Sequence, residues 1–139
     1  MLYLELITPD RVVFEGEVDW VSLPTPDGEI TVLLHHIPLL SILAPGSVLF
    51  RQKEEESLFA VSRGVIEIDG TNVRVLADTA DRATELEEEV IRQAKEKAEQ
   101  LLKEKRADAE EFAEAAAMLE RELARLKVVR RHRTGRKHP

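Results

Sequence analysis

Residues 64–93, GVIEIDGTNVRVLADTADRATELEEEVIRQ, contain the point at which the hydrophobic period of the chain changes. In GVIEID and NVRVLAD apolar and polar residues alternate, so that Val75 can face a core while Arg74 meets water. The intervening DGTN is typical of a hairpin turn. After Ala80 the apolar spacing becomes three and four residues, which indicates a helix. The stretch therefore predicts a β domain followed by a helical one.

Upstream of this stretch, the chain consists of further short β-type runs separated by turn signals. Prolines lie in the connections, where a missing backbone donor does least harm. Seven or more short strands at this spacing predict an antiparallel sandwich or barrel. The further runs are LYLELIT, RVVFEG, VDWVSLP, EITVLL, SVLFRQ and SLFAVS, and the turn signals are TPD, TPDGE and APG.

Downstream, two helices are predicted. Thr84 with Glu87 fits a capping box for the first, and Asp108 with Glu111 offers a cap for the second. Because the link between them is short, the helices should lie antiparallel. The apolar stripe of the first comprises Leu86, Val90, Ala94, Ala98, Leu101 and Leu102, and that of the second Phe112, Ala116, Leu119, Leu123 and Leu126.

Composition narrows the classes of protein. The 139 residues suffice for one ordinary domain or two small ones that pack together. The chain has no cysteine, which excludes disulfides and thiol nucleophiles and suits a reducing compartment. No apolar run approaches the roughly 20 residues needed to cross a bilayer, and MLYLELITPD lacks the basic start and cleavage site of a signal peptide. We expect a soluble protein, or one peripheral to a membrane through a partner.

Charge is unevenly distributed along the chain. The formal net charge is -7, yet residues 127–139 carry six Lys/Arg and no Asp or Glu. Residues 1–126 then hold 14 basic and 27 acidic residues. An acidic body repels nucleic acid and anionic lipid, so only the basic end can attract an anionic partner. We expect residues 132–139 to form a disordered basic tail, because Gly135 and the like charges oppose a helix.

The order of these segments resembles the epsilon subunit of F-type ATP synthases. The family's opening strand, proline turn, Phe and Gly are similar to ITPDRVVFEGEV. Its GELGILPGHAPLLT-LRPG-V is similar to DGEITVLLHHIPLLSILAPGSV, its VSGGFLEV-NVTVLADTA to AVSRGVIEIDGTNVRVLADTA, and its last helix to ELARLKVVR. The match covers essentially residues 3–131. We expect an α+β fold: an N-terminal antiparallel β-sandwich over residues 1–82, an antiparallel two-helix hairpin over residues 83–131, and the tail.

The resemblance implies a non-catalytic rotor subunit of a proton-translocating ATP synthase, without cofactor, metal or catalytic residues. In that family the sandwich lies between the gamma subunit and the ring of c subunits. The helices act as a brake on ATP hydrolysis, reaching an acidic motif on the catalytic beta subunits when extended. The implied location is peripheral, on the cytoplasmic side of the cell membrane, through partner subunits.

Partner-binding residues follow from the resemblance position by position. Glu29 and His36 fall in the loop region that faces the ring. The inhibitory contact would be made by basic residues of the last helix, which an acidic partner attracts more than it attracts the acidic body. These are Arg121, Arg125, Lys127, Arg130 and Arg131.

The chain departs from the family in three places. The Pro-Gly before the family's histidine is Leu34-His35, which predicts a reshaped turn, and Arg63 replaces the first Gly of SGG. ATP-binding relatives carry I/L-D-x-x-R-A at the first helix, where this chain reads LEEEVI from Leu86. The remaining motif positions are Leu86 and Glu87, with Arg92 two residues beyond the missing arginine. Nearby acids would repel a polyphosphate, so we predict no tight ATP binding.

Other readings of the chain rest on weaker patterns. His35 and His36 are neighbours that point to opposite faces of an extended strand and cannot chelate a metal together. No nucleophile elbow, phosphate loop or paired-acid context indicates an enzyme. The alternative function is an adaptor that binds nucleic acid or an acidic partner through its basic tail, although no aromatic residue there could stack on bases.

Overall fold

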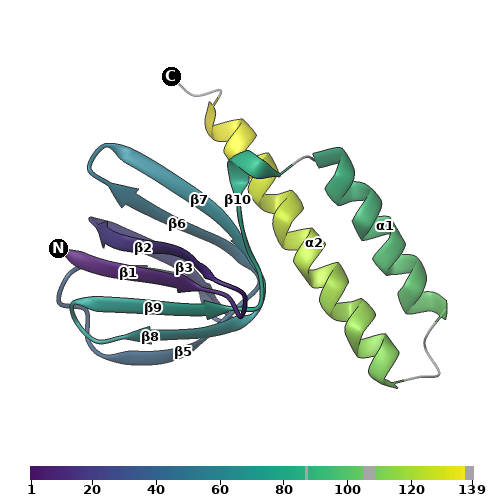
Figure 1. The fold of residues 1–139 in the computed structure, drawn as a ribbon, viewed down its shortest axis with the longest axis horizontal. Helices are drawn as coiled ribbons and strands as arrows, with labels where there is room; N and C mark the ends of the chain where they lie inside the picture. Colours follow the sequence, from purple (N-terminus) through teal and green to yellow (C-terminus); the bar gives the residue numbers. More distant parts are fainter. Residues whose placement is uncertain (87, 105–108, 137–139) are drawn as a thin grey trace.

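The computed structural model describes residues 1–86, 88–104 and 109–136, with side chains described as far as His132. A two-layered β-sandwich forms the N-terminal part, and two helices lie beside one end of it (Figure 1). The predicted α+β fold, a sandwich followed by a helical hairpin, is confirmed. None of the helices in the described ranges is long and apolar enough to span a membrane.

The sandwich consists of two five-stranded sheets in the described part of the chain. One has the order β2-β1-β9-β8-β5 and the other β10-β7-β6-β3-β4. All pairings are antiparallel except that of β1 with β9, which is parallel. The strands are β1 Leu2–Ile7, β2 Val12–Val18, β3 Trp20–Thr25, β4 Gly28–Val32, β5 Leu39–Leu43, β6 Gly46–Gln52, β7 Glu55–Val61, β8 Gly64–Ile68, β9 Asn72–Ala77 and β10 Ala80–Arg82.

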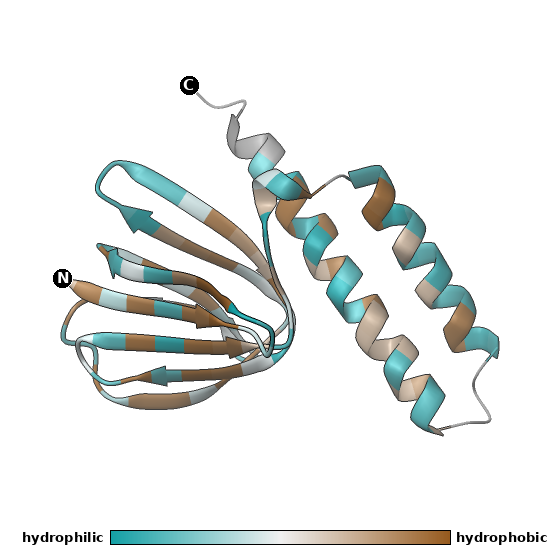
Figure 2. Cartoon of the chain, viewed as in Figure 1, coloured by the Kyte–Doolittle hydropathy of each residue, from teal (hydrophilic) through white to brown (hydrophobic). Residues whose placement is uncertain are grey.

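The core lies between the sheets and follows the alternation in the sequence. In the β8–β9 hairpin, Ile66 pairs with Val75 and Ile68 with Val73, and all four side chains are buried. The same alternation colours β8 and β9 in Figure 2, whereas β5 is largely hydrophobic. Burial of each such side chain contributes about 1.5–3 kcal/mol, so the period-two pattern supplies the main stabilisation of this domain.

Two strands were not anticipated from the sequence. The first, β5, follows Pro38 and shows no alternation, and it forms the edge of its sheet by pairing with β8. The second, β10, has only three residues. It pairs with β7 and forms one edge of the second sheet, whose other edge is β4. Both depend on a neighbouring strand far away in sequence, so local pattern alone does not reveal them.

The helical part contains a 3-10 turn η1 at Ala83–Glu85, helix α1 at Glu88–Glu104 and helix α2 at Ala109–Arg136. The two helices run antiparallel and contact each other (Figure 1), as predicted. The predicted capping box at Thr84 is wrong. Thr84 belongs to η1, Leu86 is extended, and α1 begins only at Glu88. Asp108, the predicted second cap, lies outside the described residues.

The apolar stripes were only partly right. Val90 is 59% exposed, and Phe112 and Leu123 are exposed as well. In α1, which begins at Glu88, Ile91 is buried and the neighbouring Val90 is not. Helix α2 continues to Arg136, through five residues of the predicted tail, and residues 137–139 lie outside the described part. The buried residues of α2 are Ala115, Glu122, Ala124, Leu126 and Val128.

Gly64, at the start of β8, lies against the backbone of β9. A Cβ built on it would lie 1.8 Å from the carbonyl oxygen of Leu76 and 2.9 Å from the Cα of Ala77. Because these are backbone atoms in a paired strand, they cannot move without separating β8 from β9. Arg63, which replaces the neighbouring family glycine, is exposed and forms an ion pair with Glu120 of α2. Gly64, where a side chain would clash with β9, is therefore retained, whereas position 63 accepts an arginine because its side chain is exposed.

We expect Gly64→Ala to lower the free energy of unfolding by about 3 kcal/mol or more, since the added methyl overpacks the β8–β9 pair. Urea unfolding followed by circular dichroism measures this. Gly16→Ala is the matched control, because its Cβ would meet the Phe14 ring at 3.3 Å and the Gln52 side chain at 3.5 Å, which can shift. The control should cost less than about 1 kcal/mol. Equal effects of the two variants would contradict the prediction.

Candidate functional site

The connection between β4 and β5 begins with a tight turn at Leu33–His36. The backbone N–H of His36 donates to the Leu33 carbonyl at 3.2 Å, and His35 has a φ of 67°. A positive φ at the third residue is the mark of a type II turn, which favours Pro-Gly at its centre. Leu34-His35 therefore occupies the place of the family's Pro-Gly in a turn that is closed by a hydrogen bond, and a reshaping relative to the family stays a prediction.

A second contact secures the same turn. The His35 N–H donates to the Gly70 carbonyl of the β8–β9 turn at 2.7 Å. The two turns thus meet at the end of the sandwich away from the helices (Figure 1). Left-handed backbone costs a residue with a side chain roughly 1–2 kcal/mol, and the hydrogen bond at His35 helps to offset this.

Of the two residues predicted to face a partner, His36 is the last residue of this turn and Glu29 lies near the start of β4. Glu29 is exposed on β4, opposite Pro24 of β3. His36 is half-buried, and its Nδ1 donates to the Ile37 carbonyl at 2.7 Å, which orients the ring. Neither is part of a group of three or more acidic or histidine side chains that could hold a metal ion within the described ranges.

Exposed apolar residues are concentrated in the Leu33–His36 turn and the residues that follow it, and we call this set the apolar rim. Contiguous exposed apolar groups of this kind mark interaction sites in soluble proteins. Sequence reasoning missed it, although the run IPLLSIL, which contains no charge, was a usable signal. The rim comprises Leu33, Leu34, Ile37, Leu39, Leu40 and Ile42, whose exposed fractions range from 37% to 75%.

The second candidate surface is the basic part of α2, where Arg125 holds the central position. Its Nε and Nη2 donate to Oδ2 of Asp81 on β10, at 2.8 and 2.7 Å. Its Nη1 donates to Oε1 of Glu122 at 2.9 Å, and Arg121 Nε lies 3.3 Å from the same oxygen. Arg125 therefore joins α2 to the last strand of the sandwich.

The remaining predicted cations lie further along α2. Arg130 Nε donates to Glu88 of α1 at 3.2 Å, and Arg131 Nη1 donates to the Ser47 hydroxyl of β6 at 2.8 Å. Lys127 is exposed. The four arginines are thus turned toward acceptors within the chain in this folded arrangement, rather than collected on one open face.

Glu122 was not identified from the sequence. It is only 2% exposed, although acidic side chains are seldom buried unless they are paired. Its carboxylate accepts from both Arg121 and Arg125, which compensates the cost of removing its charge from water. The i,i+3 spacing to Arg125 was the available signal, but that spacing also occurs on solvated helix faces.

The degraded ATP-motif positions are Leu86, Glu87 and Arg92, of which the structure describes the first and the last. Leu86 packs against the small cluster of Ala60, Ala83 and Val128, and Glu87 lies outside the described residues. Arg92 Nη2 donates to Glu89 Oε2 at 2.6 Å. This hydrogen bond and the charge of Glu89 raise the pKa of the Arg92 guanidinium. The nearest arginine is therefore already paired with an acid of its own helix.

Comparison with known proteins gives consistent matches. Residues 1–83 match the family "ATP synthase, Delta/Epsilon chain, beta-sandwich domain". The chain is 38% identical over 132 residues to the ATP synthase epsilon chain of Herpetosiphon aurantiacus, covering 95% of this chain and 96% of that one. It is 44% identical over 127 residues to the ATP synthase epsilon chain of Moorella thermoacetica, covering 91% and 94%.

A solved structure shares the fold. A chain in the Euglena gracilis mitochondrial ATP synthase structure, described as OSCP/F1/c-ring in rotational state 1, superposes with a TM-score of 0.74. The identity is 21%, and the superposition covers 88% of this chain and 78% of that one. At this identity the likeness concerns the fold alone.

We expect isothermal titration of the full chain with magnesium ATP to show no binding up to about 1 mM, because Arg92 is paired and the surrounding residues are acidic. A variant that restores the Asp and the Arg of the relatives' pattern, Glu87→Asp with Val90→Arg, serves as the positive control, since the exposed Val90 position accepts a long side chain. A dissociation constant in the micromolar range for the unmodified chain would refute the prediction.

Proposed function

Because the chain belongs to the ATP synthase epsilon chain family, which is a non-catalytic subunit of the enzyme, we propose that it is a rotor subunit of the central stalk. In this proposal residues 1–82 dock between the gamma subunit and the c-ring. Residues 83–131 form a regulatory hairpin that inhibits ATP hydrolysis through the beta subunits, and residues 132–139 add basic charge. The protein would be peripheral on the cytoplasmic side of a proton-translocating membrane complex, attached through these partners.

The apolar rim is the observation that supports docking most directly. Six large apolar side chains are exposed within ten residues of sequence, around a turn held by two hydrogen bonds. Their burial against a partner would contribute about 25 cal/mol for each Å² of apolar surface removed from water. His36, the last residue of that turn, would supply a polar contact that sets orientation, and Glu29, near the start of β4, would supply another where the interface extends along that strand.

The construction of the hairpin supports a regulatory role. The apolar cluster that it shares with the sandwich has two alanines and one valine as its buried members, Ala60, Ala83 and Val128, with Leu58 and Leu86 only partly buried against them. Alanine burial contributes much less than leucine burial, so separation of the hairpin from the sandwich has a modest cost. Once separated, α2 would present Arg121, Arg125 and its other cations to an acidic partner.

We expect Leu40→Asp to abolish stable association of the chain with its gamma and c-ring partners, because it places a charge at the centre of the apolar rim, where Leu40 is 72% exposed. The isolated variant should keep its unfolding midpoint, since that side chain is not part of the core. Co-purification from solubilised membranes measures the association.

Val90→Asp is the matched control for the docking experiment. Val90 is similarly exposed but lies on α1, at the other end of the molecule from the β4–β5 turn. This variant should associate as the unmodified chain does. If Leu40→Asp also associated normally, docking through the apolar rim would be excluded.

Removal of residues 85–139 should leave association with gamma intact and raise the ATP hydrolysis rate of the reconstituted complex by about five-fold or more, because the docking surface is kept and the brake is lost. A complex containing Leu40→Asp in the truncated chain separates loss of docking from loss of inhibition. An unchanged hydrolysis rate, under conditions in which the intact subunit inhibits, would exclude the regulatory role of the helices.

A further inference from the structure

The Arg125–Asp81 contact is the feature of the folded hairpin that the proposed function leaves unexplained. Its two residues are 44 positions apart, one on α2 and the other on β10, the strand that leads directly into the hairpin. Two nitrogens of the guanidinium approach the same carboxylate oxygen at 2.8 and 2.7 Å. The contact therefore ties the hairpin to the edge of the sandwich next to the point where the chain leaves it (Figure 1).

This ion pair is better shielded than the Arg63–Glu120 pair, which also joins the sandwich to the hairpin. The side chains of Arg125 and Asp81 are 21% and 30% exposed, whereas those of Arg63 and Glu120 are 59% and 42% exposed. Exposed pairs contribute little to stability, and partly buried, hydrogen-bonded pairs contribute more. The contact therefore adds to the apolar cluster of Ala60, Ala83 and Val128 in holding the two parts together.

Glu122 has a different relation to Arg125. The two residues are three positions apart on the same helix, so their hydrogen bond at 2.9 Å moves with α2 wherever the helix goes. The bond to Asp81, in contrast, must break when the hairpin leaves the sandwich. Separation therefore removes one carboxylate from Arg125 while the other continues to orient the guanidinium.

We propose that Asp81 is an internal competitor of the acidic partner for Arg125. In the folded state the carboxylate of Asp81 binds the guanidinium of Arg125. In the extended state the hairpin presents the same guanidinium to its partner. Folded and inhibitory states then require the same guanidinium and exclude each other. This inference rests on the proposed function, and it adds a named sandwich residue that sets how readily the inhibitory state forms.

Competition has a signature that a purely structural ion pair lacks. Asp81→Asn breaks the contact from the sandwich side and leaves Arg125 available, so the hairpin extends more readily and inhibits more strongly. Arg125→Gln breaks the same contact from the helix side and removes the group that the partner binds, so the hairpin extends but inhibits less. The two variants should therefore shift the hairpin in the same direction and the hydrolysis rate in opposite directions.

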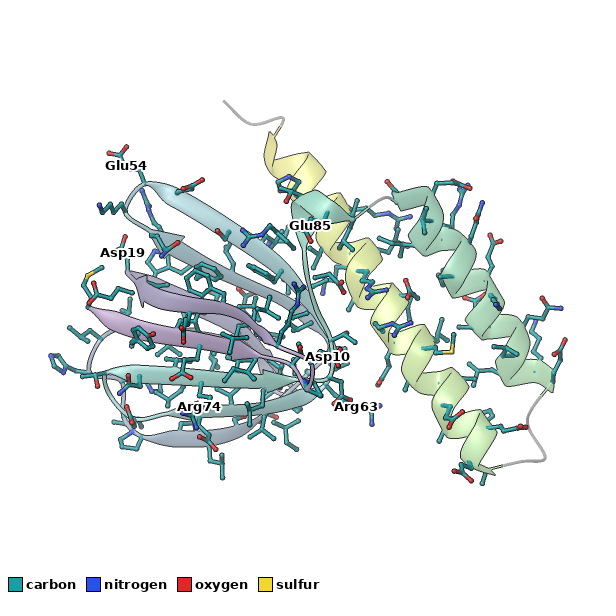
Figure 3. All side chains as sticks on the ribbon, in the orientation of Figure 1. Asp10, Asp19, Glu54, Arg63, Arg74 and Glu85 are labelled. Atoms are coloured by element: carbon teal, nitrogen blue, oxygen red, sulfur yellow. The ribbon has the colours of Figure 1, made fainter. Side chains whose placement is uncertain are left out.

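Hairpin position can be measured in the full chain, because the sequence contains no cysteine and two can be added for labelling. Glu54→Cys in the β6–β7 turn and Gln93→Cys on α1 carry spin labels, and their distance distribution gives the extended fraction. Asp81→Asn and Arg125→Gln should each raise that fraction about five-fold. Asp19→Asn is the matched control, since it removes the same charge at the end of the sandwich away from the hairpin (Figure 3).

ATP hydrolysis by the reconstituted complex is the second measurement. We expect Asp81→Asn to lower the rate and Arg125→Gln to raise it, with Asp19→Asn unchanged. Changes of the same sign in the first two variants, or an extended fraction for Asp81→Asn equal to that of Asp19→Asn, would overturn the competition. If the truncated chain lacking residues 85–139 did not alter hydrolysis, the proposed function would fail, while the distance measurement would still decide whether Asp81 holds the hairpin.

Discussion

The β8–β9 hairpin is the constraint on which both candidate surfaces depend. Its turn supplies the Gly70 carbonyl that accepts from His35 and holds the β4–β5 turn. Its first strand pairs with β5, which carries half of the apolar rim, and its second strand leads through β10 to Asp81. Because Gly64 brings β8 and β9 into close backbone contact, a disturbance of this pair would reach the docking end and the hairpin end together.

The two candidate surfaces differ in chemistry, since the apolar rim consists of exposed aliphatic side chains and the α2 surface of paired arginines. The apolar rim is exposed around a rigid, hydrogen-bonded turn, which suits a permanent interface because little ordering is needed on binding. The arginines of α2 form hydrogen bonds with carboxylates and a hydroxyl of their own chain, and the buried apolar residues between the hairpin and the sandwich are Ala60, Ala83 and Val128. Such contacts can be exchanged for others of the same kind, which suits a reversible interface.

The uneven distribution of charge along the chain favours the folded arrangement of the hairpin. The body is strongly acidic and the end of α2 is basic, so the folded hairpin satisfies within one chain an attraction that a partner could also satisfy. The buried carboxylate of Glu122 and the Asp81 carboxylate place Arg125 between two anions. In the proposed function, the same charge complementarity that stabilises the folded arrangement would let α2 bind an acidic surface of a partner.

The sequence by itself determined the order of the domains, most of the strands and the antiparallel helices, because alternation and helical spacing are local properties. Tertiary structure alone decided that β5 and β10 form edges, that His35 takes a left-handed conformation, and that Glu122 is buried. It also decided that Arg125 meets Asp81. These features require segments distant in sequence to meet in one register, and no local pattern carries that information.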